Sequence, residues 1–184
     1  DVNPKQMDNY LVAKEWYSKA NNAEDRHVQH IMMRALFRSY PTRSQLDYAD
    51  ALQREGKFTG VTVAAWQGGF DEWTGIYGAM EFKAPDCVLH MEANEDDVRQ
   101  MAADNNVSEA VVQRWLKHYQ NTTNYRYWRT RSQSEARAET AEAHELIFDG
   151  EQEYRKGELD SAVAKLIRGM GLFAEMLERH PDLA

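Results

Sequence analysis

Two histidines near the start of the chain could begin a metal site. His27 and His30 lie three residues apart, and on a helix this spacing puts both imidazoles on one face. A metal site needs a third and a fourth ligand, and Glu24 is the only acidic residue placed to join them on that face. The pattern permits a metal site without specifying one, and we favour the simpler interpretation of two surface histidines.

A second pair with possible chemistry is Cys87 and His90. A nucleophilic cysteine requires a base and an orienting group, and nearness in sequence does not provide that geometry. Attachment of a haem would need another cysteine before the histidine, and Cys87 is the only cysteine in the chain. The simpler interpretation is a small buried thiol in an apolar turn.

Large apolar side chains recur with helical spacing between residues 63 and 77. Val63, Trp66, Phe70, Trp73 and Tyr77 follow one another at intervals of three and four, which is the period of a helix face and not of a strand. Such a stripe more often builds a core than binds a cofactor, because one tryptophan buries up to ~250 Å². A groove lined by part of the stripe could still receive a partner helix, so its four aromatic residues are candidate partner contacts.

Aromatic and cationic side chains alternate in one later segment: Tyr125, Arg126, Tyr127, Trp128, Arg129 and Arg131. Proteins that bind single-stranded nucleic acid use such groups for stacking and phosphate contact. On a helix, however, Tyr125 and Trp128 point one way, while Arg126 and Arg129 point another. We interpret the segment as a core anchor flanked by solvated arginines, and keep Arg126 and Arg129 as candidate partner contacts.

The composition indicates a globular, helical chain with an acidic surface. With 184 residues it can form one domain or two small ones, each with a core of its own. Its 10 glycines and 4 prolines are too few for the many turns of an all-β fold. The formal net charge of −8 disfavours nucleic acid and anionic membranes as partners, because both carry negative charge.

The beginning of the sequence and its hydropathy bear on membrane attachment. The chain begins at Asp1 and not at methionine, so we expect a processed product or a part of a longer protein. No run approaches the ~18 apolar residues that a membrane span needs. Contact with a membrane is therefore expected only through an anchor upstream of this sequence.

Helix signals cover the first third of the chain. Asp8 is expected to cap a first helix, and a second helix should run over residues 23–38. Tyr40-Pro41 should end it, because the residue before a proline is pushed out of the α region. Ser44 should then cap a third helix that stops at Gly56.

The helical pattern fades in the middle of the chain and then returns. We expect a loop or linker over residues 81–93, in which Cys87 to Met91 form either a short strand or a helical turn. Asn94 should cap the next helix, whose first turn is acidic. One long helix is expected over residues 125–155 and a last one over residues 160–179.

An internal repeat links two segments at an offset of 101 residues. The matched positions are Ala49 and Gly150, Arg54 and Arg155, Gly56 and Gly157, Phe58 and Leu159, Val61 and Ala162, and Gly68 and Gly169. Small residues in both helices allow close approach, and the glycine between them supplies a left-handed turn. The second segment resembles the tetratricopeptide repeat at Gly150, Tyr154, Gly157, Leu159, Ala162, Leu166 and Gly169.

The expected fold is all-α, with helical hairpins packed in a tetratricopeptide-like, non-solenoid, right-handed array. The predicted division has an N-terminal helical subdomain over residues 1–80, with a hairpin at about 44–77. The loop or linker 81–93 separates it from a C-terminal helical subdomain over residues 94–184, with a hairpin at about 125–180.

A second resemblance draws on three parts of the chain: Asp8-Asn9-Tyr10-Leu11-Val12 with Trp16-Tyr17, Ala65-Trp66, and Asn124-Tyr125-Arg126-Tyr127-Trp128-Arg129-Thr130-Arg131 with the terminal hairpin. Together they resemble the C-terminal region of a family of large, uncharacterised planctomycete proteins with an N-terminal membrane anchor. The resemblance implies a membrane-attached, extracytoplasmic protein and assigns no catalytic residue.

Three hypotheses for the function follow. The first is a non-catalytic helical scaffold or protein-interaction module, without a cofactor, within a membrane-attached protein; its partner is another protein, contacted by Trp66, Phe70, Trp73, Tyr77, Arg126 and Arg129. The second is a metal- or thiol-dependent enzyme that uses His27, His30, Cys87 and His90. The third is a structural protein that assembles with further copies of itself.

Overall fold

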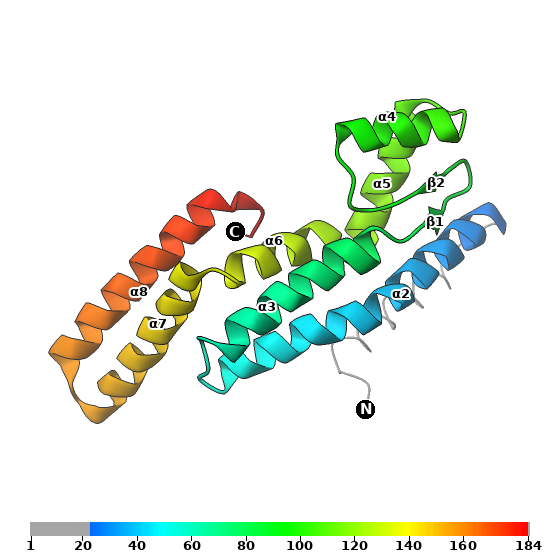
Figure 1. Ribbon diagram of the computed structural model, residues 1–184. Helices are drawn as coiled ribbons and strands as arrows, with labels where there is room; N and C mark the ends of the chain where they lie inside the picture. Colours follow the sequence, from blue (N-terminus) through cyan, green and yellow to red (C-terminus); the bar gives the residue numbers. More distant parts are fainter. Residues whose placement is uncertain (1–22, 184) are drawn as a thin grey trace. The chain divides into compact units, whose positions relative to one another are not determined.

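The computed structural model describes residues 23–183, and the helix expected after Asp8 lies outside them. Seven α-helices and one two-stranded sheet form the described part, so the predicted all-α class is confirmed (Figure 1). Tetratricopeptide-like packing of these helices stays a prediction. The helices are α2 (Ala23–Arg54), α3 (Val61–Glu72), α4 (Glu95–Asp104), α5 (Glu109–Thr123), α6 (Tyr125–Glu135), α7 (Ala138–Lys156) and α8 (Leu159–Arg179).

Shorter elements complete the described chain. A π-helical turn, Trp73–Gly78, follows α3, and a 3₁₀ turn, Pro181–Leu183, follows α8. The two strands are β1 (Phe82–Lys83) and β2 (Val88–Leu89), which pair antiparallel with Phe82 opposite Leu89. The segment predicted as a loop or linker thus contains a hairpin, and Cys87 to Met91 include a strand and no helical turn.

The chain divides into two compact units. Unit 1 comprises the described residues up to Pro41 together with Thr74–Tyr125, and unit 2 comprises Thr42–Trp73 together with the described residues from Arg126 onward. Each unit therefore combines two separate stretches of sequence, whereas the predicted subdomains were continuous. The reason is that α2 passes from unit 1 into unit 2, and the segment after α3 passes back.

Helix α2 continues through Pro41, so the predicted helix end at Tyr40-Pro41 is wrong. A proline inside a helix removes one N–H donor and crowds the preceding turn, and this local cost was the basis of the prediction. The helix is held instead by apolar residues on both sides of the proline, since Ala35 and Leu36 are buried before it and Leu46 and Ala49 after it. Burial of these side chains outweighs the local preference.

Unit 1 has an aromatic core. The ring of Tyr77 lies 5.5 Å from that of Phe82 and 6.3 Å from that of Tyr125, and Phe82 lies 5.3 Å from Tyr119. The Tyr77 hydroxyl donates to the backbone carbonyl of Ala35 over 2.8 Å, so this buried group is satisfied. These contacts join α2, the π turn, β1 and α5 around one core.

Side-chain hydrogen bonds position the hairpin and the helix that follows it. The amide of Asn105 accepts from the Val88 N–H over 2.7 Å and donates to the Val88 carbonyl over 3.0 Å, which ties β2 to the end of α4. The predicted cap at Asn94 is confirmed as a capping box, since its side chain accepts from the Asp96 and Asp97 amides and Asp97 bonds back to the Asn94 amide.

In unit 2 the predicted long helix over residues 125–155 is two helices. Helix α6 ends at Glu135, and α7 begins at Ala138 after Arg137 takes an extended conformation with φ −85° and ψ 143°. Glu135 is a buried carboxylate that accepts from Gln53 over 2.8 Å and lies 2.9 Å from His144 Nε2. Bonds from α2 and α7 thus hold the end of α6, which local periodicity does not reveal.

Helices α7 and α8 form an antiparallel hairpin (Figure 1). Gly157 makes the turn with φ 85°, as predicted. A Cβ on Gly150 would lie 2.8 Å from Leu166, and one on Gly169 would lie 3.0 Å from the Ala143 carbonyl oxygen. The small residues therefore allow the two helices to approach closely, which is the physical role the repeat assigned to them.

The matching hairpin between α2 and α3 uses a different glycine from the expected one. Gly56 makes its turn with φ 77°, in agreement with the repeat. Gly68 has only Gln45 within 4 Å of its added Cβ, whereas a Cβ on Gly69 would collide with Leu46. Close approach in this hairpin therefore depends on Gly69, one position after the residue that the repeat aligned.

Candidate functional site

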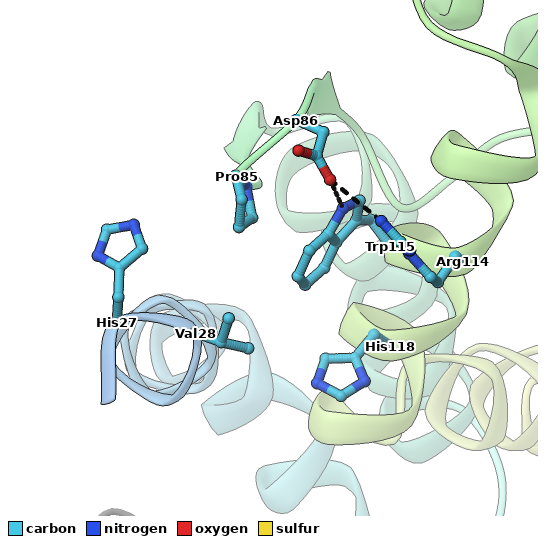
Figure 2. Close-up of a pocket in the computed structure, with 7 residues that line it drawn as sticks. All are labelled: His27, Val28, Pro85, Asp86, Arg114, Trp115 and His118. Atoms are coloured by element: carbon cyan, nitrogen blue, oxygen red, sulfur yellow. Dashed lines mark hydrogen bonds and ion pairs between the residues drawn. The ribbon is translucent and has the colours of Figure 1, made fainter. Parts of the chain in front are cut away.

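A pocket of about 420 Å³ lies on unit 1 beside the start of α2 (Figure 2). Helix α2 contributes His27 and Val28, the loop between the strands contributes Pro85 and Asp86, and α5 contributes the remainder. The seven lining residues are His27, Val28, Pro85, Asp86, Arg114, Trp115 and His118. Two imidazoles, a carboxylate and an indole are thus brought together from three separate parts of the chain.

Some polar groups of this pocket are hydrogen-bonded to one another. The Asp86 carboxylate accepts from Arg114 Nη2 and from Trp115 Nε1, each over 3.1 Å (Figure 2). His27 and His118 project from different helices, and Figure 2 draws no bond to either imidazole. The Asp86 carboxylate therefore orients the indole and is largely neutralised by Arg114, while the two imidazoles come from α2 and α5.

The structure does not gather the four metal or thiol candidates into one group. His27 and His30 are both exposed on α2, and only His27 lines the pocket. Cys87 is buried and His90 is half-buried in the hairpin. Among the side chains that the structure describes, no three from His, Cys, Asp or Glu lie so that they could hold a metal ion.

The electrostatic surroundings of Cys87 bear on the thiol hypothesis. Burial raises the pKa of its thiol, the neighbouring Asp86 raises it further, and Arg114 lowers it in part. The thiolate is the reactive form of cysteine, and a raised pKa keeps the group protonated at neutral pH. The environment is therefore that of an inert buried thiol.

The aromatic partner candidates lie mostly in the cores of the two units. In unit 2, Trp66 and Trp73 are buried and Phe70 is half-buried. In unit 1, Tyr77 is buried and bonded to the backbone of α2. Three of these four side chains are buried and therefore not accessible to a partner. Of the four, Phe70 is the one that is partly exposed to solvent.

The two cationic candidates lie on α6. Arg126 is exposed, and Arg129 is half-buried with its guanidinium 5.7 Å from the centre of the Phe70 ring. That distance is within the range of a cation–π contact, which covers one side of the ring. Binding of a partner by these residues stays a prediction.

An exposed apolar surface that was not predicted from the sequence lies on α8. Four large apolar side chains on this helix are more than half exposed: Leu159, Val163, Ile167 and Met170. Their spacing of four, four and three puts them on one face, which we call the α8 stripe. Another face of the same helix, with Ala162, Gly169 and Met176, is buried. The sequence does contain a sign of this surface. Apolar residues cover a wider part of the circumference of α8 than α7, its one partner in the hairpin, can bury.

The polar surroundings of the α8 stripe are acidic. Residues 138–179 carry ten acidic and five basic side chains. Two of the basic ones are paired with α7: Arg168 with Glu142, and Lys165 with Asp149 over 3.2 Å and with Glu153 over 2.7 Å.

Comparison with known proteins adds no relative, because no protein-family model, curated protein or solved structure matches this chain. The resemblance to membrane-anchored planctomycete proteins and to the tetratricopeptide repeat therefore stays a prediction. Among the described helices, none combines the length and the apolar character that crossing a membrane requires.

Proposed function

We propose that this chain is a non-catalytic helical interaction module, and that it binds a helix of another protein on the α8 stripe. The observation that carries the proposal is the exposure of four large apolar side chains on one face of a long, regular helix. Contiguous apolar surface of this kind marks interaction sites on soluble proteins. From Leu159 to Met170 the stripe extends about 16 Å, which matches three turns of a partner helix.

Charge determines what kind of helix fits. Asp160 lies beside the α8 stripe on its solvent side by helical spacing, Glu175 and Glu178 lie on that side beyond its Met170 end together with Arg179, and Arg168 is paired with Glu142. A partner with an apolar seam and basic flanks complements this rim, whereas a partner with acidic flanks is repelled. We therefore propose a basic amphipathic helix as the occupant, bound in the manner of a helix laid along an apolar surface.

The acidic residues beside the α8 stripe also disfavour self-assembly through it. Two copies joined through the α8 stripe would bring two acidic rims together, and like charges across an interface disfavour association. A second copy is therefore an outcome of the test and not the proposed occupant.

Two isoleucines of similar exposure allow a matched test. Ile167 in the α8 stripe is 64% exposed, and Ile76 in unit 1 is 56% exposed. Isothermal titration calorimetry would follow two synthetic helical peptides that share a leucine seam and carry either lysine or glutamate flanks. The lysine peptide should bind the unmodified protein one to one. Ile167→Ser should weaken this binding about tenfold or more, because a buried isoleucine contributes ~1.5–3 kcal/mol, and Ile76→Ser should leave it unchanged.

Three outcomes would overturn the proposal. The first is an absence of saturable binding by the lysine peptide. The second is equal weakening by the two serine variants, which would indicate charge attraction without a defined site. The third comes from sedimentation: a dimer of the unmodified protein that Ile167→Ser dissociates would make a second copy the occupant.

A further inference from the structure

A second pocket of unit 1, of about 490 Å³, lies between α2, β1 and α5. Arg34 and Arg38 stand one turn apart on α2 and line one wall, and Lys83 on β1 lines another. Phe82 and Tyr119 also line it. Three cationic side chains thus converge on one cavity of a chain whose formal net charge is −8. We call this pocket the basic cleft.

One of the three cations is held in place by the protein. Arg38 Nη1 donates to the backbone carbonyl of Glu81 over 2.8 Å, and its guanidinium lies 4.9 Å from the centre of the Phe82 ring. A carbonyl oxygen carries no net charge, so this bond orients the guanidinium without neutralising it. A preorganised guanidinium loses little conformational entropy when it binds a ligand.

The positive charge of the basic cleft is not balanced by ion pairs. In the part of the chain that the structure describes, Arg34 and Lys83 take part in no ion pair, and both residues are exposed. Among the described residues that line the cleft, Glu81 is the single acidic one. Three cations against one carboxylate leave a net positive charge, and a low-dielectric wall strengthens its field inside the cleft.

Tyr119 provides a neutral polar group in the cleft. Its hydroxyl donates to the Lys83 backbone carbonyl over 2.9 Å. Burial raises the pKa of Tyr119 to about 12 and Cys87 adds to this effect, while Arg38 and Arg34 lower the pKa. The hydroxyl therefore stays protonated at neutral pH and presents no negative charge to a ligand. The effect of Arg34 and Arg38 on the pKa of Tyr119 shows that both guanidinium groups lie near this hydroxyl.

From this arrangement we propose that the basic cleft binds a phosphate group carried by a small organic molecule. Arg34, Arg38 and Lys83 together match an anion with two or more charges, whereas a single carboxylate supplies one. Guanidinium groups bind phosphate oxygens through paired N–H donors, and lysine adds a point charge. A cavity of about 490 Å³ exceeds what phosphate alone would fill and lies within the usual ~300–1,000 Å³ range of small-molecule sites. The basic cleft belongs to unit 1, and ligand binding there does not depend on the proposed role of the α8 stripe.

Inorganic pyrophosphate is the first probe, titrated into the whole chain at low ionic strength and followed by calorimetry. It should bind saturably at one site per chain. Arg34→Gln and Lys83→Gln should each weaken binding about tenfold, because each removes a charge-assisted contact. Arg99→Gln is the matched control, since Arg99 lies on α4 of the same unit, is exposed, and pairs with Asp96 over 2.8 Å. Arg99→Gln removes one positive charge, as Arg34→Gln and Lys83→Gln do, and it should leave the affinity for pyrophosphate unchanged.

Co-sedimentation with vesicles separates two sources of the phosphate. Binding to phosphatidic acid vesicles, but not to phosphatidylcholine vesicles, with loss in Arg34→Gln, would identify a lipid headgroup. Saturable binding of pyrophosphate without vesicle binding would identify a soluble compound, and either result supports the site. The proposal is overturned if pyrophosphate binding does not saturate. It is also overturned if Arg99→Gln weakens pyrophosphate binding as much as Arg34→Gln does. A glutamate-rich peptide that binds more tightly than pyrophosphate would also overturn it, in favour of an acidic peptide.

Discussion

The guanidinium of Arg131 lies 2.6 Å from the carboxylate of Asp50, although the two residues are 81 positions apart. Arg131 also lies 5.1 Å from the ring centre of Trp66 and 5.3 Å from that of Trp128. The pair joins α6 to α2 within unit 2, and it is partly buried, since the side chains of Arg131 and Asp50 are 20% and 18% exposed. An ion pair in this position contributes more than one on an open surface.

Removal of the Arg131 side-chain charge should destabilise unit 2. Arg131→Met leaves the Asp50 carboxylate partly buried without its α6 partner, and we expect a loss of about 2 kcal/mol, between the values for exposed and buried pairs. Arg54 also pairs with Asp50, but its side chain is 65% exposed. Arg54→Met should therefore cost less than about 0.5 kcal/mol.

Chemical denaturation followed by circular dichroism measures both effects, and Asp50→Asn completes a double-mutant cycle with Arg131→Met. Equal losses of unfolding free energy for Arg131→Met and Arg54→Met would show that the Arg131–Asp50 pair stabilises unit 2 no more than an exposed ion pair does.

Two glycines of α8 should respond to alanine with opposite signs. A Cβ on Gly169 would lie 2.9 Å from Ile147 Cγ1 and 3.0 Å from the Ala143 carbonyl, so Gly169→Ala must push α7 and α8 apart. We expect a loss of about 1–3 kcal/mol from this overpacking. Gly171 has nothing within 4 Å of an added Cβ, and Gly171→Ala should stabilise the helix by up to about 1 kcal/mol.

Thermal unfolding of the two alanine variants distinguishes these effects. The midpoint should fall for Gly169→Ala and rise for Gly171→Ala. A rise for both variants would mean that the hairpin adjusts to a wider separation at no cost.

The caps of α4 and α5 should differ in their importance. The Asn94 side chain accepts two backbone hydrogen bonds at the start of α4, whereas Ser108 precedes α5 without a side-chain bond to the helix. Asn94→Ala should cost about 1 kcal/mol, as for other capping residues, and Ser108→Ala should cost distinctly less. Hydrogen exchange of the first-turn amides of each helix measures the change locally, and similar acceleration in both helices would contradict the expected difference.

Unit 1 should lose stability in alkaline solution. Burial, with a smaller effect of Cys87, raises the pKa of Tyr119 from its ordinary value of 10 to about 12 in the folded state. Below pH 10 the hydroxyl is protonated in both states, so its contribution to stability is fully present. Between pH 10 and about 12 the unfolded chain loses this proton and the folded chain keeps it, so stability falls as the pH rises.

Ultraviolet absorbance would follow phenolate formation in the whole protein and in Tyr119→Phe. The difference between the two titrations should show one phenol that ionises near pH 12. A difference curve centred near pH 10 would show that the hydroxyl is open to water in the folded protein.

Part of the candidate surfaces was visible in the sequence and part was not. Arg34, Arg38 and Lys83 are ordinary charged residues in the sequence, spaced over two separate segments. They meet only because β1 and α5 pack against α2. The apolar residues of α8 were visible, but which of them stay exposed depends on how many helices cover α8.

The sequence by itself determined the features that arise within one element or one turn. The all-α class follows from helical periodicity, the stops at Gly56 and Gly157 follow from a backbone conformation that glycine readily adopts, and the cap at Asn94 follows from hydrogen bonds within three residues. Each of these has a local cause, so neighbouring residues contain the whole signal.

Only the tertiary structure decided the features that depend on distant neighbours. Helix α2 runs through Pro41 because packed side chains on both sides compensate a local cost, and α6 stops at Glu135, whose carboxylate is bonded from α2 and α7. The chain also divides into units of non-contiguous segments, because α2 begins in unit 1 and ends in unit 2 and the segment after α3 belongs to unit 1 again. In each case the deciding free energy comes from burial and hydrogen bonds between residues far apart in sequence, which a local pattern does not contain.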